Sequence, residues 1–280
     1  MRLPLGYLAE NDKKNVGVFE EHFSNVLNSN KKNDKNIINK IILRKFMTEL
    51  DKVPTWEEFM NAVAQLPNNK APGINNVLPN SLKTKSETNF LHYFNFILKF
   101  WEDRLDYVEL HKGEVILVPK NEDLSDPDKW IHVNLMDIGE MCKRLLKIIN
   151  LHGVKYQFGS SPGVGFQDNL FALKTALHAQ HNQNLPNFFA FVDLVKASDT
   201  VDHGMIIGIL KRYVAPPTII SAIVRMYADP KIFLKIGKVK AEMKQTIVVR
   251  RGDCMVPVLF LFMMMAFSQI LEKDWKTSGL

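Results

Sequence analysis

The sequence has few of the features that mark secreted, zinc-binding or membrane-spanning proteins. It contains two cysteines, Cys142 and Cys254, too few for a disulfide framework or a cysteine-rich zinc site. Residues 1–10 contain no apolar signal-peptide core, which together with the scarce cysteine predicts an intracellular protein, nuclear or cytoplasmic. The most apolar stretch, 256–267, is shorter than the roughly twenty residues that cross a bilayer, so it predicts a buried helix and no membrane partner.

Several recurrent sites and architectures are also absent. Gly163-Val164-Gly165 lacks the Lys-Ser/Thr that follows in a phosphate-binding P-loop, the histidines show no ligand spacing, and the chain has no internal repeat. With 46% hydrophobic and 24% charged residues, the composition is that of a globular protein and excludes a collagen-like or wholly disordered chain. The net charge of +6 permits a polyanionic partner without requiring one.

The hydrophobic periodicity predicts a mixed succession of helices and strands. Thr55 and Glu58 have the spacing of a capping box, which predicts that a helix begins there. Residues 28–40 are rich in Asn and Lys and predict an exposed loop or flexible link. The predicted helices are 18–27, 55–66, 90–101, 136–150, 168–180, 199–213, 216–226 and 256–271; the predicted strands are 114–119, 187–193 and a hairpin of 231–236 with 244–249.

Asp193 is the most informative candidate for chemistry. It follows an apolar run, 188–192, and precedes a predicted helix, which would place its carboxylate at the rim of a sheet where a metal ion or substrate can reach it. The alternative is an aspartate that caps the following turn. Asp199 and Asp202 complete an acidic cluster of the kind that divalent-metal sites use, although both also fit helix capping at or near Ser198.

A second candidate is the basic pair Arg250-Arg251 before Gly252. Two arginines at the start of an apolar helix are able to bind a phosphate through side chains and free N–H groups together. The alternative is an exposed basic turn.

Two segments resemble catalytic motifs of the reverse transcriptases of non-LTR (LINE-type) retrotransposons. Residues 191–203, FVDLVKASDTVDH, resemble the first motif, and residues 250–260, RRGDCMVPVLF, resemble the next, usually written RQGDPxSPxLF. Shorter matches precede them in the order the family has: Lys70 to Gly73, Leu117 to Lys120, Trp130 with Leu135, and Phe158-Gly159 with Asp168. The resemblance covers about residues 55 to 271.

The resemblance implies an α+β fold in the form of a right-hand polymerase. Residues 1–54 would be a helical extension and polar link, 55–187 the fingers with interleaved palm segments, and 188–280 a truncated palm. The family carries two further aspartates in an aromatic-x-Asp-Asp motif, and no Asp-Asp pair occurs before Leu280. The palm sheet is therefore expected to be incomplete, which would leave strand 188–192 with an unpaired, aggregation-prone edge.

The activity that the resemblance implies is RNA-directed DNA synthesis, with an RNA template, a DNA primer and deoxynucleoside triphosphates as partners. Two Mg²⁺ ions would stabilise the attacking and leaving oxygens. Asp193 would bridge both ions with help from the Leu194 carbonyl, while Lys120, Ser198, Arg251 and Gly252 would contact the nucleotide. Ser198 and Arg251 replace the family's usual aromatic and glutamine, and with the missing aspartates this predicts that the chain alone polymerises poorly.

Two other hypotheses stay open. One is a non-catalytic nucleic-acid-binding module that retains the fingers surface, with Lys143, Arg144, Lys147 and Lys155 contacting phosphates. The other is an unrelated α+β interaction protein whose motif matches arise by chance. The sequence indicates neither an oligomeric state nor a template preference.

Overall fold

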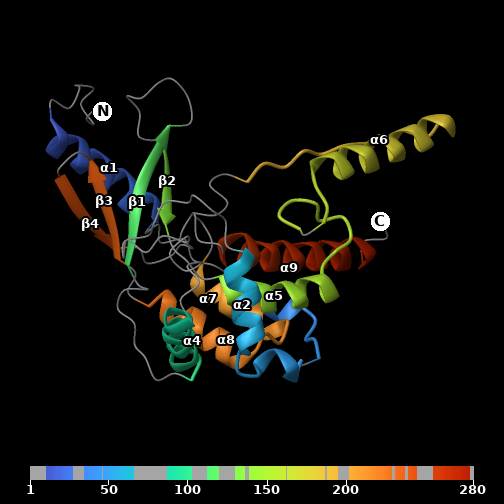
Figure 1. The fold of residues 1–280 in the computed structure, drawn as a ribbon. Coiled ribbons are helices and arrows are strands. Elements are labelled where there is room, and N and C mark those ends of the chain that lie inside the picture. Colours follow the sequence, from blue (N-terminus) through green and yellow to red (C-terminus); the bar gives the residue numbers. More distant parts are fainter. Residues whose placement is uncertain are drawn as a thin grey trace.

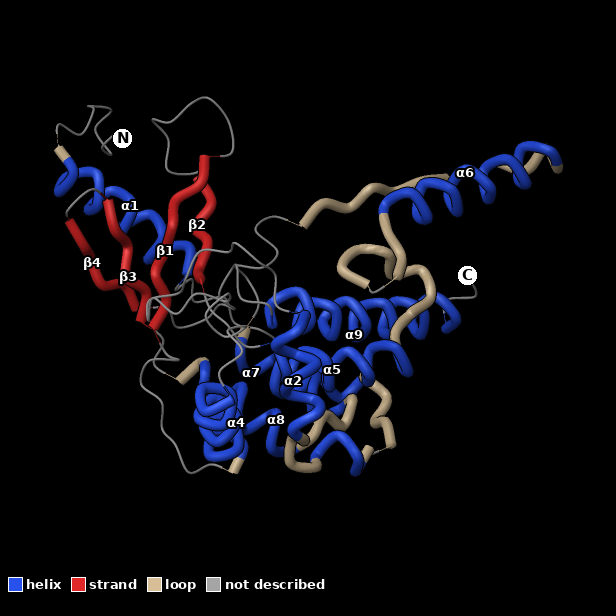
Figure 2. Tube along the Cα trace, in the orientation of Figure 1, coloured by secondary structure: helices blue, strands red, loops and turns tan. Residues whose placement is uncertain are grey.

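The computed structural model describes residues 11–27, 35–45, 47–65, 87–102, 112–119, 130–135, 139–161, 163–186, 188–194, 202–228, 231–236, 239–244 and 255–277. These residues form a helical body, a small sheet beside it, and one helix that projects from the body (Figure 1). Figure 2 shows that the strands gather at one side and that helices make up the rest.

The helical body is built around one long apolar helix, α9 (Met255–Thr277). Helices α5 (Gly139–His152) and α7 (His203–Arg212) pack on α9, α2 (Trp56–Gln65) packs on α5, and α8 (Pro217–Met226) contacts both α7 and α4 (Glu87–Trp101). Two short 3₁₀ helices, η1 (Lys35–Lys40) and η2 (Thr48–Asp51), pack on α7 and α8. The predicted loop 28–40 therefore contains a helical turn.

One hydrophobic core fills this body. Its fully buried side chains include Leu145 of α5, Ile219 of α8 and Phe262 of α9. Ile41 and Leu50 join the same cluster, so all three predicted regions, 1–54, 55–187 and 188–280, contribute to it. Burial of a large apolar side chain stabilises by about 1.5–3 kcal/mol, and a core shared in this way couples the folding of distant segments.

Helix α9 is longer than the apolar run that predicted it. Within the described part of the chain it is the one helix whose length and composition would allow it to cross a membrane. Leu259, Phe262 and Met265 of this helix are buried among the other helices. In this structure α9 serves as the central helix of the body.

The sheet has four strands in the order β2-β1-β3-β4. Strand β1 (Lys112–Pro119) pairs antiparallel with β2 (Trp130–Leu135) and parallel with β3 (Lys231–Ile236), which pairs antiparallel with β4 (Val239–Lys244). Helix α1 (Asp12–Leu27) contacts β3 and β4. Phe19 of α1 and Leu234 of β3 are buried on this side of the molecule.

The predicted hairpin has its second strand in the wrong place. The structure pairs Ile236 with Val239, so the second strand is 239–244 and not 244–249. This register sets Ala241 opposite the buried Leu234, which keeps small and apolar side chains together. Residues 245–249 lie outside the described residues.

The predicted strand 187–193 is also wrong. The described residues 188–194 belong to no strand, and their side chains are exposed, with Phe188 at 92% and Phe191 at 89%. The segment follows α6 (Phe166–Asn182), which projects from the body and has no buried residue (Figure 1). Apolar composition alone does not make a strand, because a strand needs a neighbour to take its hydrogen bonds.

The helix ends show which local signals decided the fold. Thr55 Oγ1 accepts the Glu58 N–H at 3.2 Å and Glu58 Oε2 accepts the Thr55 N–H at 3.0 Å, which confirms the predicted capping box. Helix α7 begins later than predicted, at an N-cap formed by Asp202, whose Oδ1 accepts the Met205 N–H at 2.7 Å. Ser198 and Asp199, the predicted caps, lie outside the described residues.

Candidate functional site

Asp193 belongs to the exposed segment 188–194. The chain between α6 and α7 leads back from the projecting helix toward the body (Figure 1). Its side chain is exposed, as is that of Leu194, at 51%. The sequence predicted a carboxylate at the rim of a sheet, and the structure instead places it on a segment that pairs with no strand among the described residues. The carboxylate is accessible to a cation or a substrate, but no sheet holds its position.

The other predicted nucleotide-binding residues cannot be placed beside Asp193. Lys120, Ser198, Arg251 and Gly252 all lie outside the described residues. The predicted meeting of Asp193 with the nucleotide-binding residues therefore stays a prediction.

Asp202, the last member of the predicted acidic cluster, is used by the fold. Its Oδ1 accepts the Met205 N–H and so caps α7, as the structural alternative predicted. Asp199, the middle member of that cluster, is not among the described residues. The cap engages Oδ1 of this carboxylate.

Among the described residues, Asp193 has the donor chemistry that a Mg²⁺ ligand needs. Mg²⁺ is bound through one or two carboxylates together with waters and substrate phosphates, and Asp193 offers one exposed carboxylate of that type. Among the side chains that the structure describes, no group of three or more His, Cys, Asp or Glu residues converges as a metal site.

The environment of Arg144 contradicts its predicted place in a nucleic-acid interface. It is only 3% exposed, and its guanidinium donates to the carbonyl oxygens of Leu50, at 2.8 Å, and of Lys52. It also forms an ion pair with Glu58 at 2.8 Å and stacks on the ring of Trp101, 4.8 Å from its centre. These contacts join η2, α2, α4 and α5, so Arg144 is a structural residue and the prediction that it contacts phosphate is wrong.

The three predicted lysines near Arg144 have a different environment. Lys147 and Lys155 are exposed and Lys143 is partly buried. Lys143 and Lys147 are four residues apart on α5 and so share a face of that helix, while Lys155 follows its end. These lysines remain candidates for phosphate contacts.

The Glu58 carboxyl shows the electrostatic effect of the Arg144 cluster. Partial burial by itself would raise the pKa of Glu58, but the Thr55 N–H, the Arg144 guanidinium and the charge of Lys147 together outweigh it and hold that pKa below its usual value. Glu58 is thus kept charged by its local cap and by two basic residues of α5, which ties the start of α2 to α5.

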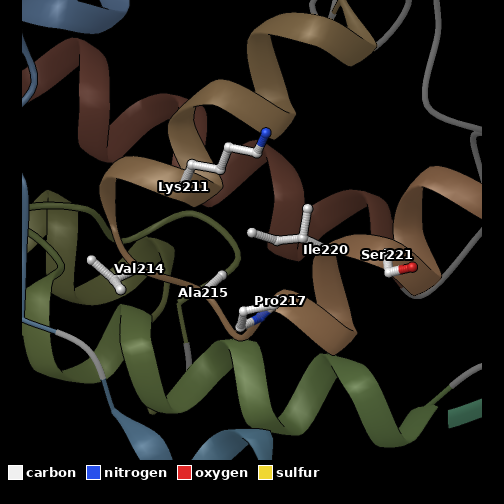
Figure 3. Close-up of a pocket in the computed structure, with 6 residues that line it drawn as sticks. All are labelled: Lys211, Val214, Ala215, Pro217, Ile220 and Ser221. Atoms are coloured by element: carbon white, nitrogen blue, oxygen red, sulfur yellow. The ribbon is translucent and has the colours of Figure 1, made fainter. Parts of the chain in front are cut away.

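An open apolar groove lies between α7 and α8 (Figure 3). Its volume is about 420 Å³, and Lys211 extends from α7 toward Ile220 of α8 while Ala215 and Pro217 line the connecting turn. Val214, which also borders the groove, has a left-handed backbone with φ 55°. No sequence pattern predicted this groove, because the left-handed position that often ends a helix holds valine here in place of the usual glycine.

A polar cluster inside the body was also missed. Arg44 Nε, His152 Nε2 and Gln269 Nε2 are buried and have no hydrogen-bond partner among the described residues. The Tyr213 hydroxyl donates to Gln269 Oε1 at 3.0 Å, and burial raises the pKa of Tyr213 to about 12. Burial, helped by Arg44, lowers the pKa of His152. No local sequence pattern predicts this cluster, because Arg44, His152, Tyr213 and Gln269 come from four separate segments.

Comparison with known proteins gives one informative similarity. No protein-family model matches this sequence. The chain is 24% identical over 189 residues to the transposon TX1 uncharacterized 149 kDa protein of Xenopus laevis. The matched part is 65% of this chain and 14% of that protein, so the chain spans a small fraction of its relative's length. The similarity links the chain to transposon-encoded proteins.

Proposed function

We propose that this chain derives from a non-LTR retrotransposon and corresponds to part of its reverse transcriptase, the enzyme that copies an RNA template into DNA. The observation that carries the proposal is the segment 191–203, whose aspartate Asp193 is exposed, in a chain similar to a transposon-encoded protein. The second motif, 250–260, follows at the family's place in the order. The reaction class is transfer of a nucleotide from a deoxynucleoside triphosphate to a primer 3′-OH.

In this proposal Asp193 is a ligand of Mg²⁺, and the polypeptide assayed by itself is a very poor polymerase. Removing one group that stabilises the transition-state charge typically costs about 10²–10³ in rate. No Asp-Asp pair occurs within the 280 residues, so the remaining carboxylates of the two-ion centre would be lacking. The fold we propose for the chain is a fingers-and-palm polymerase.

Metal-directed cleavage tests the role of Asp193 without requiring turnover. Fe²⁺ in place of Mg²⁺, with ascorbate and peroxide, generates radicals that cut the backbone beside the bound ion. We expect a cut near Asp193 that needs both an RNA–DNA primer–template and a deoxynucleoside triphosphate, because one carboxylate binds Mg²⁺ together with substrate phosphates. Asp193→Asn should abolish the cut. Asp202→Asn, a conservative change at the α7 cap, is the matched control and should keep it.

Primer extension provides the second arm. We expect no template-dependent extension above background with Mg²⁺ and a homopolymer template. Cleavage that ignores the nucleotide, or that persists in Asp193→Asn, would contradict the assignment of Asp193. Rapid extension by the isolated chain would refute the requirement for further carboxylates.

The second candidate function is a non-catalytic nucleic-acid-binding module, favoured by the exposed Lys147 and Lys155. Fluorescence anisotropy with a labelled primer–template over a KCl series tests it. Binding should weaken steeply with salt, and Lys147→Ala and Lys155→Ala should each lower the log–log slope by about 1. Lys99→Ala on α4 is the control and should leave the slope unchanged. Salt-dependent binding without nucleotide-dependent cleavage at Asp193 would favour this function over the polymerase.

A further inference from the structure

The strongest unassigned feature is one face of the hairpin β3–β4, which forms the outer half of the sheet (Figure 2). Along both strands apolar residues alternate with charged residues and Phe233, the pattern of a sheet with one covered face and one face in water. On the apolar face Leu234 is fully buried. On the other face Glu242 is exposed and Phe233 is partly exposed, so the charged face is the open one.

The strand register gathers lysine positions on this open face. Lys231 of β3 pairs with Lys112 of β1 on one side and with Lys244 of β4 on the other, so three lysines form a row across three strands. Lys235 pairs with Lys240 and forms a second row. Paired positions, and positions two apart along a strand, share a face. The face therefore holds five lysines against two glutamates, a net charge of +3: Lys112, Lys231, Lys235, Lys240, Lys244, Glu114 and Glu242.

The two lysine rows place like charges directly opposite one another, which destabilises a sheet. The two glutamates offset only part of this charge. Lysines on an edge strand protect the edge from pairing with other chains, and this accounts for the lysines of β4, the edge strand. It does not account for Lys231 and Lys235, because β3 lies between β1 and β4. A bound polyanion would neutralise both rows and release the counterions held by its phosphates.

Phe233 indicates which polyanion fits this face. Its position lies midway between the two lysine rows, two residues or roughly 7 Å along β3 from Lys231 and from Lys235. A single-stranded nucleic acid carries a phosphate on either side of each base, and its bases stack on aromatic side chains of open sheet faces. An acidic peptide would supply the negative charge but no planar base for the phenylalanine ring. The combination of charge and ring therefore favours single-stranded nucleic acid.

We propose that the open face of β3–β4 binds single-stranded nucleic acid, with one base stacked on Phe233 and the flanking phosphates on the two lysine rows. The positive charge supplies most of the affinity, and the ring distinguishes a nucleic acid from other polyanions. This inference goes beyond the functions proposed above, because it uses neither Asp193 nor the lysines of α5. The binding requires no Mg²⁺ and no deoxynucleoside triphosphate.

Fluorescence anisotropy of the full chain in EDTA, with a labelled oligouridylate and an abasic strand of equal length, tests the role of Phe233. We expect Phe233→Ala to weaken oligouridylate binding about 5-fold or more and to leave binding of the abasic strand unchanged. Phe233→Tyr keeps a ring of similar size and should retain the affinity, which separates stacking from a folding defect. Phe267→Ala, at a phenylalanine 54% exposed on α9, is the matched control and should bind as wild type does. Equal binding of the two strands, unaffected by Phe233→Ala, would refute the stacking.

The same measurement over a KCl series tests the lysine rows. Lys235→Ala and Lys240→Ala should each lower the log–log slope by about 0.7, the value for one phosphate contact on a single strand. Lys273→Ala, at an exposed lysine on α9, is the control and should leave the slope unchanged. Unchanged slopes in the two sheet variants, together with a loss of solubility, would show that these lysines only protect the sheet edge. A slope that responds to Lys147→Ala and not to Lys235→Ala would place the nucleic acid on α5 and overturn the proposal.

Discussion

Replacing Arg144 by alanine should destabilise the protein more than any change at a neighbouring lysine. The substitution removes the donor from the Leu50 and Lys52 carbonyl oxygens, removes the partner of Glu58, and empties the site over the Trp101 ring. Breaking a buried ion pair in this way costs about 3–5 kcal/mol. Glu58 is 33% exposed and water will solvate part of its charge, so the lower part of that range, about 3–4 kcal/mol, is expected here.

Urea unfolding followed by circular dichroism measures this loss. The transition midpoint should fall with an unchanged slope, and at about 2–4 °C per kcal/mol the melting temperature should drop by roughly 10 °C. Arg144→Lys keeps the charge but not the planar fork, so it should fall between wild type and alanine. Lys155→Ala, at an exposed lysine, is the control and should stay within about 0.5 kcal/mol.

The acid limb of the same experiment tests the electrostatic part. The pKa of Glu58 is lowered in the folded protein, so the Arg144 pair adds stability above the ordinary carboxyl pKa of about 4.5. That contribution disappears as the pH falls through the lowered, folded pKa. The difference in stability between wild type and Arg144→Ala should therefore shrink on acidification below pH 4.5. A loss of less than about 1 kcal/mol at pH 7, equal to that of Lys155→Ala, would refute the structural role assigned to Arg144.

Three further changes probe other parts of the body. Asp202→Ala should cost about 1 kcal/mol by removing the N-cap of α7, whereas Asp202→Ser should restore most of it, as measured by urea unfolding. Val214→Gly should stabilise the protein by about 0.5–1 kcal/mol, because glycine relieves the left-handed backbone strain at φ 55° and the greater chain entropy of glycine in the unfolded state offsets only part of that gain. A destabilised variant would show that the packing of the valine side chain contributes more than the strain costs. Burial raises the pKa of Tyr213 to about 12, so its contribution to stability is complete below pH 10 and is lost as the pH rises toward 12; spectrophotometric titration should show one late tyrosine that Tyr213→Phe removes.

The helices of the body were predictable because their signals are local. The capping residues Thr55 and Glu58 and the proline before α8 lie within a few residues of the turns they control. The helical period of α5 also predicts burial of Arg144, although its charge suggests an exposed residue. Arg144 occupies the same face as Leu145 and Ile148, which are fully buried, whereas Lys143 and Lys147 share another face.

The prediction of a strand at 187–193 was wrong because a strand depends on residues far away in the sequence. Its apolar residues predicted burial, and burial of a strand depends on partners from elsewhere in the chain or from another chain. The hairpin was half right on the same ground: strand 231–236 was predicted from its own residues, while the position of its partner strand depended on the register that sets Ala241 opposite the buried Leu234. The groove beside Val214 and the cluster around Gln269 are products of packing between segments, so no local pattern reports them.

The metal hypothesis for Asp193 depends on what orders the exposed segment 188–194. Ordering such a segment costs about 1–2 kcal/mol for each residue, so a substrate that binds through Asp193 also has to supply the free energy that fixes the segment in place. Nucleotide-dependent cleavage at Asp193 would show that the primer–template and the deoxynucleoside triphosphate supply it. Cleavage that occurs without the nucleotide, or none at all, would refute the polymerase assignment of this carboxylate.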